Sequence, residues 1–196
     1  MRETQHLIPA ALGPRRPRPR SAEFEPLGAS NVGLGGRKGM NVAFRLIALP
    51  SEEFASHFML SDPELEASGG RRIVVDEKPG VPCRVSLVDA EVGETALLLP
   101  FTHHDVSSPY RASGPIFVRS GARTANPAKD EIPAMFRHRM LSIRAYDRAA
   151  MMVGAEVLKG TDLEPVIQRF FGDAKVSYLH IHNAGPGCYN CRVERA

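Results

Sequence analysis

The sequence has no tryptophan, and only three of its 196 residues are cysteine. A low, odd number of cysteines argues against the disulfide framework of small secreted domains and favours a reducing, cytoplasmic environment. The chain has no run of about 18 apolar residues, so no membrane-spanning helix is predicted. Hydrophobic residues still make up 43% of the chain, which predicts a packed globular domain rather than disorder.

Excess positive charge is confined to the front of the chain. Residues 1–40 carry seven basic and three acidic side chains, a net charge of +4, whereas the rest of the chain carries 18 basic and 19 acidic ones. A near-neutral domain gives no electrostatic support for nucleic-acid binding. The front segment also contains GPRRPRPR at 13–20 and GASNVGLGGRKG at 28–39. Their proline, like charges and glycine oppose regular structure.

These differences in composition divide the chain into two parts. Residues 1–39 are predicted to be a disordered, basic, Pro/Gly-rich extension. Residues 40–196 are predicted to form a single globular domain, because they are too few for two domains of ordinary size. Met40 directly precedes the first convincing strand. One hypothesis is therefore that Met40 is the native start; the alternative is a basic tail with weak affinity for nucleic acid or membranes.

The hydrophobic pattern of the domain predicts an α+β fold, with a mixed, mostly antiparallel sheet, two or three helices and a C-terminal β-hairpin. A polar stretch at 102–115 shows neither helical nor strand periodicity, and such long loops are often functional. Thr161 and Glu164 form a capping-box pattern at the start of the last helix. Helices are predicted at 51–58, 130–138 and 160–172, and strands at 41–49, 71–77, 83–90, 96–101, 116–120, 140–147, 151–158, 175–183 and 188–195.

The residues richest in chemistry lie in the last two strands. His180 and His182 are two residues apart, so on a strand their imidazoles share one face. Cys188 and Cys191 follow after a turn and are three residues apart, so in a regular strand they point to opposite faces. A zinc site that uses all four side chains therefore requires an irregular second strand.

The turn of this hairpin decides which cysteine meets the histidines. If Ala184 pairs with Gly187, His180 faces Cys191 and His182 faces Tyr189. A loop one residue longer or shorter brings Cys188 to the histidine face instead, because side chains alternate along a strand.

Four interpretations of the hairpin remain open. His180, His182, Cys188 and Cys191 could hold zinc or another transition metal. A cysteine thiolate could act as a nucleophile with a histidine as its base. The histidines could belong to a site that binds an anion and could serve there as general acid or base. The fourth interpretation is a structural hairpin whose cysteines pack as small apolar groups.

A second set of polar residues supports the anion interpretation. Tyr110, Arg111 and Ser113 lie in the predicted loop, and Arg144 lies on a predicted strand. Arginine binds carboxylate or phosphate with two parallel hydrogen bonds, so these residues are candidate ligand-binding groups. The alternative is that the loop residues build turns and that Arg111 pairs with an acid such as Asp105 or Asp147.

Several phrases of the sequence carry a family resemblance. They are PCRVSLVDAEVGETALLLPF, SSPYRASGPIFVR, LSIRAYD, MMVGAEV and YLHIHNAGPGCYNCRVERA. From about Phe44 to Ala196 the chain resembles the bacterial family called domain of unknown function 1203. The resemblance implies a small bacterial protein and supplies neither an activity nor a catalytic residue.

Taken together, the residues predict a soluble protein with a polar His/Cys/Arg pocket that binds a small anionic ligand or a metal ion. His180 and His182 are its candidate catalytic residues, and no motif identifies a reaction. The alternative is a non-catalytic structural or interaction module in which the hairpin only builds the fold. Neither nucleic acid nor a membrane is an expected partner of the domain.

Overall fold

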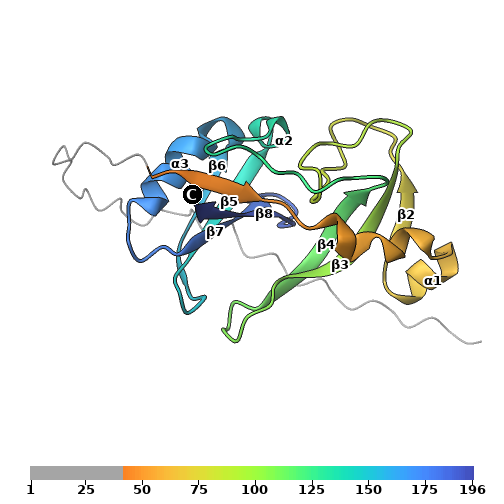
Figure 1. Cartoon of the computed structure of the whole chain (residues 1–196), viewed down its shortest axis with the longest axis horizontal. Helices are drawn as coiled ribbons and strands as arrows, with labels where there is room; N and C mark the ends of the chain where they lie inside the picture. The colour runs from red at the N-terminus through yellow and green to blue at the C-terminus, as the bar shows by residue number, and fades with distance from the viewer. Residues whose placement is uncertain (1–41) are drawn as a thin grey trace, which may run out of the picture. The chain divides into compact units, whose positions relative to one another are not determined.

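The computed structural model describes residues 42–196, so the predictions for residues 1–39 lie outside the described residues. This part of the chain is α+β and contains two antiparallel sheets (Figure 1). The larger sheet has five strands in the order β1-β8-β7-β5-β6, and the smaller has three in the order β2-β3-β4. Strands β7 and β8 form the C-terminal hairpin. The predicted fold class is therefore confirmed.

The regular elements follow the hydrophobic pattern with some shifts at their ends. The strands are β1 Phe44–Ile47, β2 Arg71–Val74, β3 Thr95–His104, β4 Ala112–Arg119, β5 Met140–Tyr146, β6 Met152–Lys159, β7 Tyr178–Asn183 and β8 Tyr189–Arg195. The helices are α1 Asp62–Ala67, α2 Ala134–Arg137 and α3 Leu163–Phe171, and short 3-10 helices span Ser51–Phe54, Ser56–Met59 and Gly160–Asp162.

One face of the five-stranded sheet is apolar, and α3 packs against it. Ile143 of β5, Ile181 of β7 and Val193 of β8 are fully buried there, together with Ile167 and Phe171 of α3. Because side chains alternate along a strand, the other face must carry the intervening residues. Those residues include Arg144, His180 and His182 of the predicted site, which therefore lie on the face opposite α3.

The three-stranded sheet has its own core, and a folded turn takes the place of the strand predicted at 83–90. Leu97, Leu99, Ile116 and Val118 form this core with side chains from segment 83–90. The prediction of a strand over 83–90 is wrong, because Leu87 has a φ of 50° and its N–H bonds back to the Cys83 carbonyl over 3.1 Å. The segment is a folded turn whose residues 83–85 are all buried.

Half of the predicted loop at 102–115 is strand. β3 runs on to His104, β4 begins at Ala112, and His104 pairs with Ala112. Only residues 105–111 connect the two strands, so the prediction of one long loop is wrong. Pro115 of the predicted loop lies directly opposite Pro100 of the predicted strand in the ladder.

Two details of helix geometry also differ from the sequence predictions. Residues 51–59 form two short 3-10 helices rather than an α-helix. Helix α3 has no side-chain cap, so the predicted Thr161–Glu164 box is not formed. A capping box instead starts α1, where the Ser61 N–H donates to the Glu64 carboxylate over 2.8 Å.

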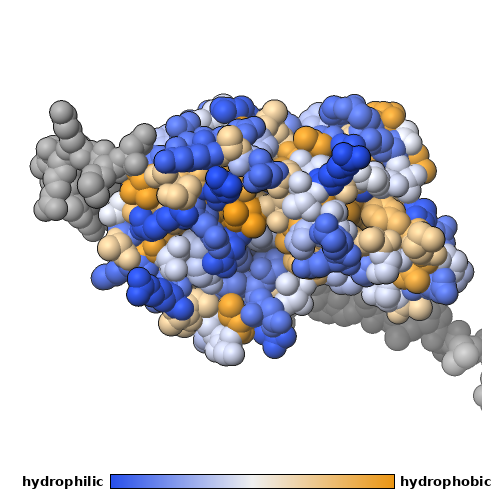
Figure 2. Space-filling model, viewed as in Figure 1, coloured by the Kyte–Doolittle hydropathy of each residue, from blue (hydrophilic) through white to orange (hydrophobic). Residues whose placement is uncertain are grey.

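The surface is mixed in polarity. On the face shown in Figure 2, hydrophilic residues cover most of the area and hydrophobic residues form separate small patches. None of the helices within residues 42–196 is both long and apolar enough to cross a membrane.

Gly160 is expected to tolerate no side chain. A Cβ at this position would lie 1.8 Å from the Phe136 carbonyl oxygen, a backbone atom that cannot turn away. Gly160→Ala should therefore destabilise the protein by about 1–3 kcal/mol in urea unfolding, the range for overpacked sites. The control Gly185→Ala meets nothing within 4 Å and should change stability by less than about 0.5 kcal/mol. Equal stability of the two variants would contradict the close packing of Gly160.

Candidate functional site

Four histidines come together where the end of β3 packs against the five-stranded sheet. The His103 ring centroid lies 5.2 Å from that of His182 and 6.2 Å from that of His180. The His104 and His180 rings are 4.9 Å apart, and those of His180 and His182 are 6.1 Å apart. We call these four residues the histidine cluster.

An irregularity in β3 brings both of its histidines into this cluster. Neighbouring residues of a regular strand point to opposite faces, so in a regular strand the His103 and His104 side chains would diverge. The β3–β4 register shifts between Phe101 and His104, however, and such an irregularity re-aims side chains. As a result, the rings of both His103 and His104 contact His180.

A second irregularity sets the hairpin register. His182 lies opposite Tyr189, as in one of the registers that the sequence left open, but His180 lies opposite Arg192 rather than Cys191. The β7–β8 register shifts between Ile181 and His182, and Asn190 is the additional residue on β8. Cys191 is thereby paired with Ile181 and turned to the apolar face.

The cysteines do not join the histidine cluster. Cys191 is fully buried in the core on the opposite face of the sheet, where burial raises the pKa of its thiol. Cys188 lies partly exposed at the end of the turn. The four-ligand set of His180, His182, Cys188 and Cys191 is therefore not assembled. Among residues 42–196, no three His, Cys, Asp or Glu side chains are placed to hold a metal ion.

Hydrogen bonds fix the tautomers of two histidines. His104 Nδ1 lies 2.7 Å from the Tyr110 carbonyl oxygen and must donate to it, so its Nε2 accepts from the Tyr178 hydroxyl, also at 2.7 Å. His182 Nδ1 donates to the Gly187 carbonyl over 2.9 Å. Since a neutral imidazole has a single N–H, the Nε2 of His182 is an acceptor.

Three imidazole nitrogens of the cluster have no hydrogen-bond partner although they are buried. They are His103 Nδ1, His180 Nδ1 and His182 Nε2. His180 and His182 are 1% and 0% exposed, respectively. An unpaired buried polar atom costs about 1–3 kcal/mol, so three in one place call for a functional explanation.

Burial keeps these imidazoles neutral. It lowers the pKa of His180 to about 2, and the positive charge that His104 and His182 would carry adds to the effect. Burial also lowers the pKa of His182 to about 3. The hydrogen bond to Gly187 raises this pKa, and the positive charge of Arg144 lowers it further. The pKa of His103 falls to about 4 because of burial and Arg144.

Two arginines flank the cluster, and they differ in charge compensation. On the sheet, Arg144 and Arg192 lie on either side of His180. Arg192 Nε donates to Glu194 over 2.6 Å, and its guanidinium lies 3.8 Å above the Tyr178 ring. Arg144 is half-buried and forms no ion pair with any acid among residues 42–196.

The other predicted anion ligands lie apart from this centre. Arg111 is exposed and pairs with Asp105 over 2.7 Å, which is the alternative that the sequence left open. Ser113 is exposed on β4. Tyr110 lies at the margin, where its ring is 6.2 Å from that of Tyr146 and its carbonyl holds His104. Of the four predicted ligand-binding residues, only Arg144 adjoins the histidine cluster.

Sequence reasoning did not place several residues in the site. Tyr146 and Tyr178 stack on each other with centroids 5.3 Å apart, and His104 lies 4.4 Å from the Tyr146 ring. The alternation of Leu97 and Leu99 continues to His103, so a longer β3 could have been read from the pattern. No comparable signal marks His104, because its orientation depends on the register shift.

A buried arginine joins the two sheets beside the site. Arg84 is 1% exposed, and its Nε donates to the Tyr189 carbonyl on β8 over 2.7 Å. A second guanidinium nitrogen donates to the Pro82 carbonyl, and the Arg84 N–H donates to Phe117 on β4 over 3.0 Å. Burial lowers the Arg84 pKa to about 10, so the guanidinium stays ionised at neutral pH.

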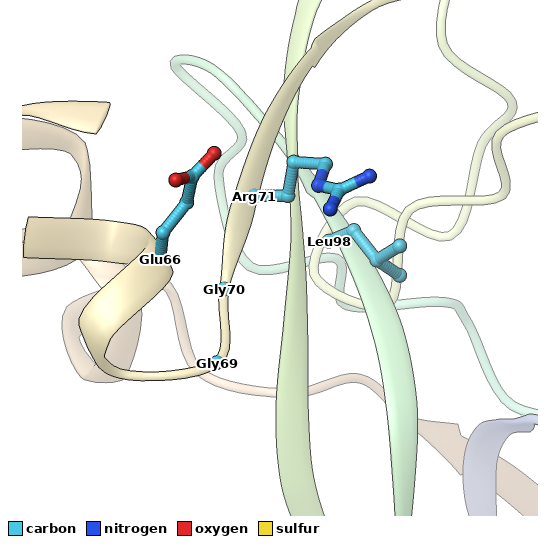
Figure 3. Close-up of a pocket in the computed structure, with 5 residues that line it drawn as sticks. All are labelled: Glu66, Gly69, Gly70, Arg71 and Leu98. Atoms are coloured by element: carbon cyan, nitrogen blue, oxygen red, sulfur yellow. The ribbon is translucent and has the colours of Figure 1, made fainter. Parts of the chain in front are cut away.

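Surface depressions elsewhere offer less chemistry. One of about 420 Å³ is lined by Glu66, Gly69, Gly70, Arg71 and Leu98. Figure 3 shows Gly69 and Gly70 linking the helix that carries Glu66 to the strand that carries Arg71. This depression brings together no group of unpaired buried atoms like that of the histidine cluster.

Comparison with known proteins identifies a family and nothing narrower. The family model described as "Protein of unknown function (DUF1203)" matches residues 80–195. This range includes all four histidines of the cluster together with Arg84, Arg144 and Arg192. No curated protein and no solved structure matches the chain.

Thiol reactivity should separate the cysteines. Cys188 is partly exposed, whereas Cys83 and Cys191 are fully buried. A chromogenic thiol reagent should therefore titrate one thiol in the native protein and all three in denaturant. Rapid native labelling of Cys191, located by peptide mass spectrometry, would contradict the observed register.

Stability should fall as the pH is lowered from 6.5 towards 5. The pKa values of His180 and His182 lie below their ordinary value of 6.5, so the unfolded chain binds more protons in this range. Urea unfolding should therefore show stability that rises with pH by about 1–3 kcal/mol per unit. His182→Gln removes one titrating group and should reduce the slope by about one proton. A flat profile for the wild type would contradict burial of neutral imidazoles.

Proposed function

The chain belongs to the DUF1203 family, and from that premise we propose that its domain binds a small anion at Arg144 and the histidine cluster. The observation that carries the proposal is a half-buried guanidinium without an acidic partner among residues 42–196, next to three unpaired imidazole nitrogens. The alternative function, a module whose hairpin only builds the fold, gives no reason for these unpaired groups.

The local charge favours an anion. Glu194, the acid on the neighbouring strand, is already engaged by Arg192, and the imidazoles are neutral because of burial. Arg144 therefore contributes one positive charge that no neighbouring acid balances. At about 4 Å and an effective dielectric constant of about 20, an opposite charge is attracted by about 4 kcal/mol before desolvation. Carboxylate and phosphate are the anions that fit the fork of a guanidinium.

His103 and Arg144 are both half-buried, whereas His180 and His182 are buried. A ligand held by Arg144 would reach the unpaired nitrogens only after neighbouring side chains move, because those nitrogens are buried. His180 and His182, the candidate catalytic residues, would act there as proton acceptors, since their neutral imidazoles have lone pairs to offer. The proposed anion binding does not require that these histidines also catalyse a reaction.

Anion binding can be tested by isothermal titration calorimetry at constant ionic strength. The probes are inorganic phosphate, sulfate, acetate and glycolate, and at least one of them should bind. Arg144→Gln should weaken that binding by about tenfold or more, because a charge-assisted pair contributes about 1.5–3 kcal/mol.

The matched control is Arg45→Gln. Arg45 is an exposed arginine on β1, opposite Glu194 and two strands away from His180, and its replacement removes the same charge. This variant should bind like the wild type. Equal affinity in the wild type and Arg144→Gln, or no binding of any probe, would overturn the proposal.

Metal analysis tests the competing zinc interpretation. A divalent cation at the cluster would be repelled by Arg144, and neither Cys188 nor Cys191 is placed to add a negative ligand. Protein purified without chelator or affinity tag should therefore contain much less than one zinc per chain. Stoichiometric zinc that His182→Gln removes would favour the metal site over the anion site.

A further inference from the structure

We infer that the anion taken by this site carries its own hydrogen-bond donor, as a hydroxycarboxylate or a hydrogen phosphate does. The inference rests on the proposed function and narrows it to a class of ligand. Its basis is the pairing of one cationic donor, Arg144, with a buried acceptor, the Nε2 of His182, on one face of the sheet.

The acceptor character of His182 follows from its partner. The Gly187 carbonyl has no hydrogen to give, so the 2.9 Å contact places the imidazole proton on Nδ1. The remaining nitrogen, Nε2, is buried and has no partner. It presents a lone pair to the cluster and becomes a donor only by gaining a charge, which burial opposes.

The two groups are neighbours on the sheet. Arg144 pairs directly with His180 on the neighbouring strand, and Ser142 pairs with His182. Arg144 and His182 are therefore diagonal neighbours on the same face, a relation in which Cα atoms are about 7–8 Å apart and long side chains meet. The lowering of the His182 pKa by Arg144 agrees with this proximity.

These requirements divide anions into two groups. Acetate and sulfate can accept from Arg144, but their oxygens would set a lone pair against that of His182 Nε2. Glycolate and hydrogen phosphate also accept from Arg144, and each has an O–H that can donate to the imidazole. A ligand that leaves a buried acceptor unpaired is bound much more weakly than one that pairs with it. This loss of affinity is larger than the loss caused by a slightly poorer fit in shape.

Two matched pairs of probes test the inference. Phosphate and sulfate have the same tetrahedral shape, and near neutral pH hydrogen phosphate differs by one P–O–H donor. Glycolate differs from acetate by one hydroxyl. Calorimetry should give affinities about tenfold or more higher for the member with the donor in each pair.

His182→Gln is the variant that isolates the imidazole. The amide of glutamine can turn either its donor or its acceptor towards the ligand, so the preference within each pair should largely disappear while binding to Arg144 continues. Arg45→Gln should keep the wild-type preference. Circular dichroism and urea unfolding of each variant show whether it is folded.

The outcomes separate this inference from the proposed function. If acetate binds as well as glycolate and sulfate as well as phosphate, with binding still dependent on Arg144, the donor requirement is wrong and anion binding stands. If none of the four probes binds, both are wrong. A folded His182→Gln variant that keeps the full preference would also overturn the inference.

Discussion

One additional residue in the β7–β8 ladder determines which side chains lie beside the histidines of this domain. Asn190 shifts the pairing of β8 by one position, so that Cys191 faces the core and Arg192 lies beside His180. Asn190 is fully buried, and its side-chain amide donates to Asn183 over 2.8 Å. A shift of one residue moves every later side chain to the other face of a strand. The guanidinium of Arg192, rather than the thiol of Cys191, therefore lies next to the histidines.

The contact between the two sheets is unusual because polar groups occupy part of it. Tertiary contacts between sheets are normally apolar, yet here His103 and His104 of β3 pack on His180 and His182, with Arg84 buried beside them. His104 and Arg84 are hydrogen-bonded to their neighbours and can be explained as structural. The unpaired nitrogens of the other three histidines lack this explanation, and local departures of this kind are expected at functional sites.

The sequence predicted those features that depend on an uninterrupted period. His180 and His182 share a face because β7 is regular between them, and the pairing of His182 with Tyr189 is one of the registers that the sequence left open. Features that depend on irregular backbone escaped prediction. His104 is turned by the shift in β3, and segment 83–90 folds back at Leu87 although its alternation resembled a strand. A side-chain pattern does not encode where a ladder gains or loses a residue.

The chemistry of the site follows from two kinds of group that act separately. Arg144 selects the sign of the ligand's charge, since no acid balances it among residues 42–196. The imidazoles add no charge, because burial makes protonation costly, and His182 selects instead for a hydrogen-bond donor through its Nε2. A bare cation would pair with the imidazole lone pair but would be repelled by Arg144. An anion without a donor would pair with Arg144 but would leave the imidazole lone pair without a partner. A molecule that joins negative charge to an adjacent O–H satisfies both, and this agreement makes donor-bearing anions the ligands that fit the site best.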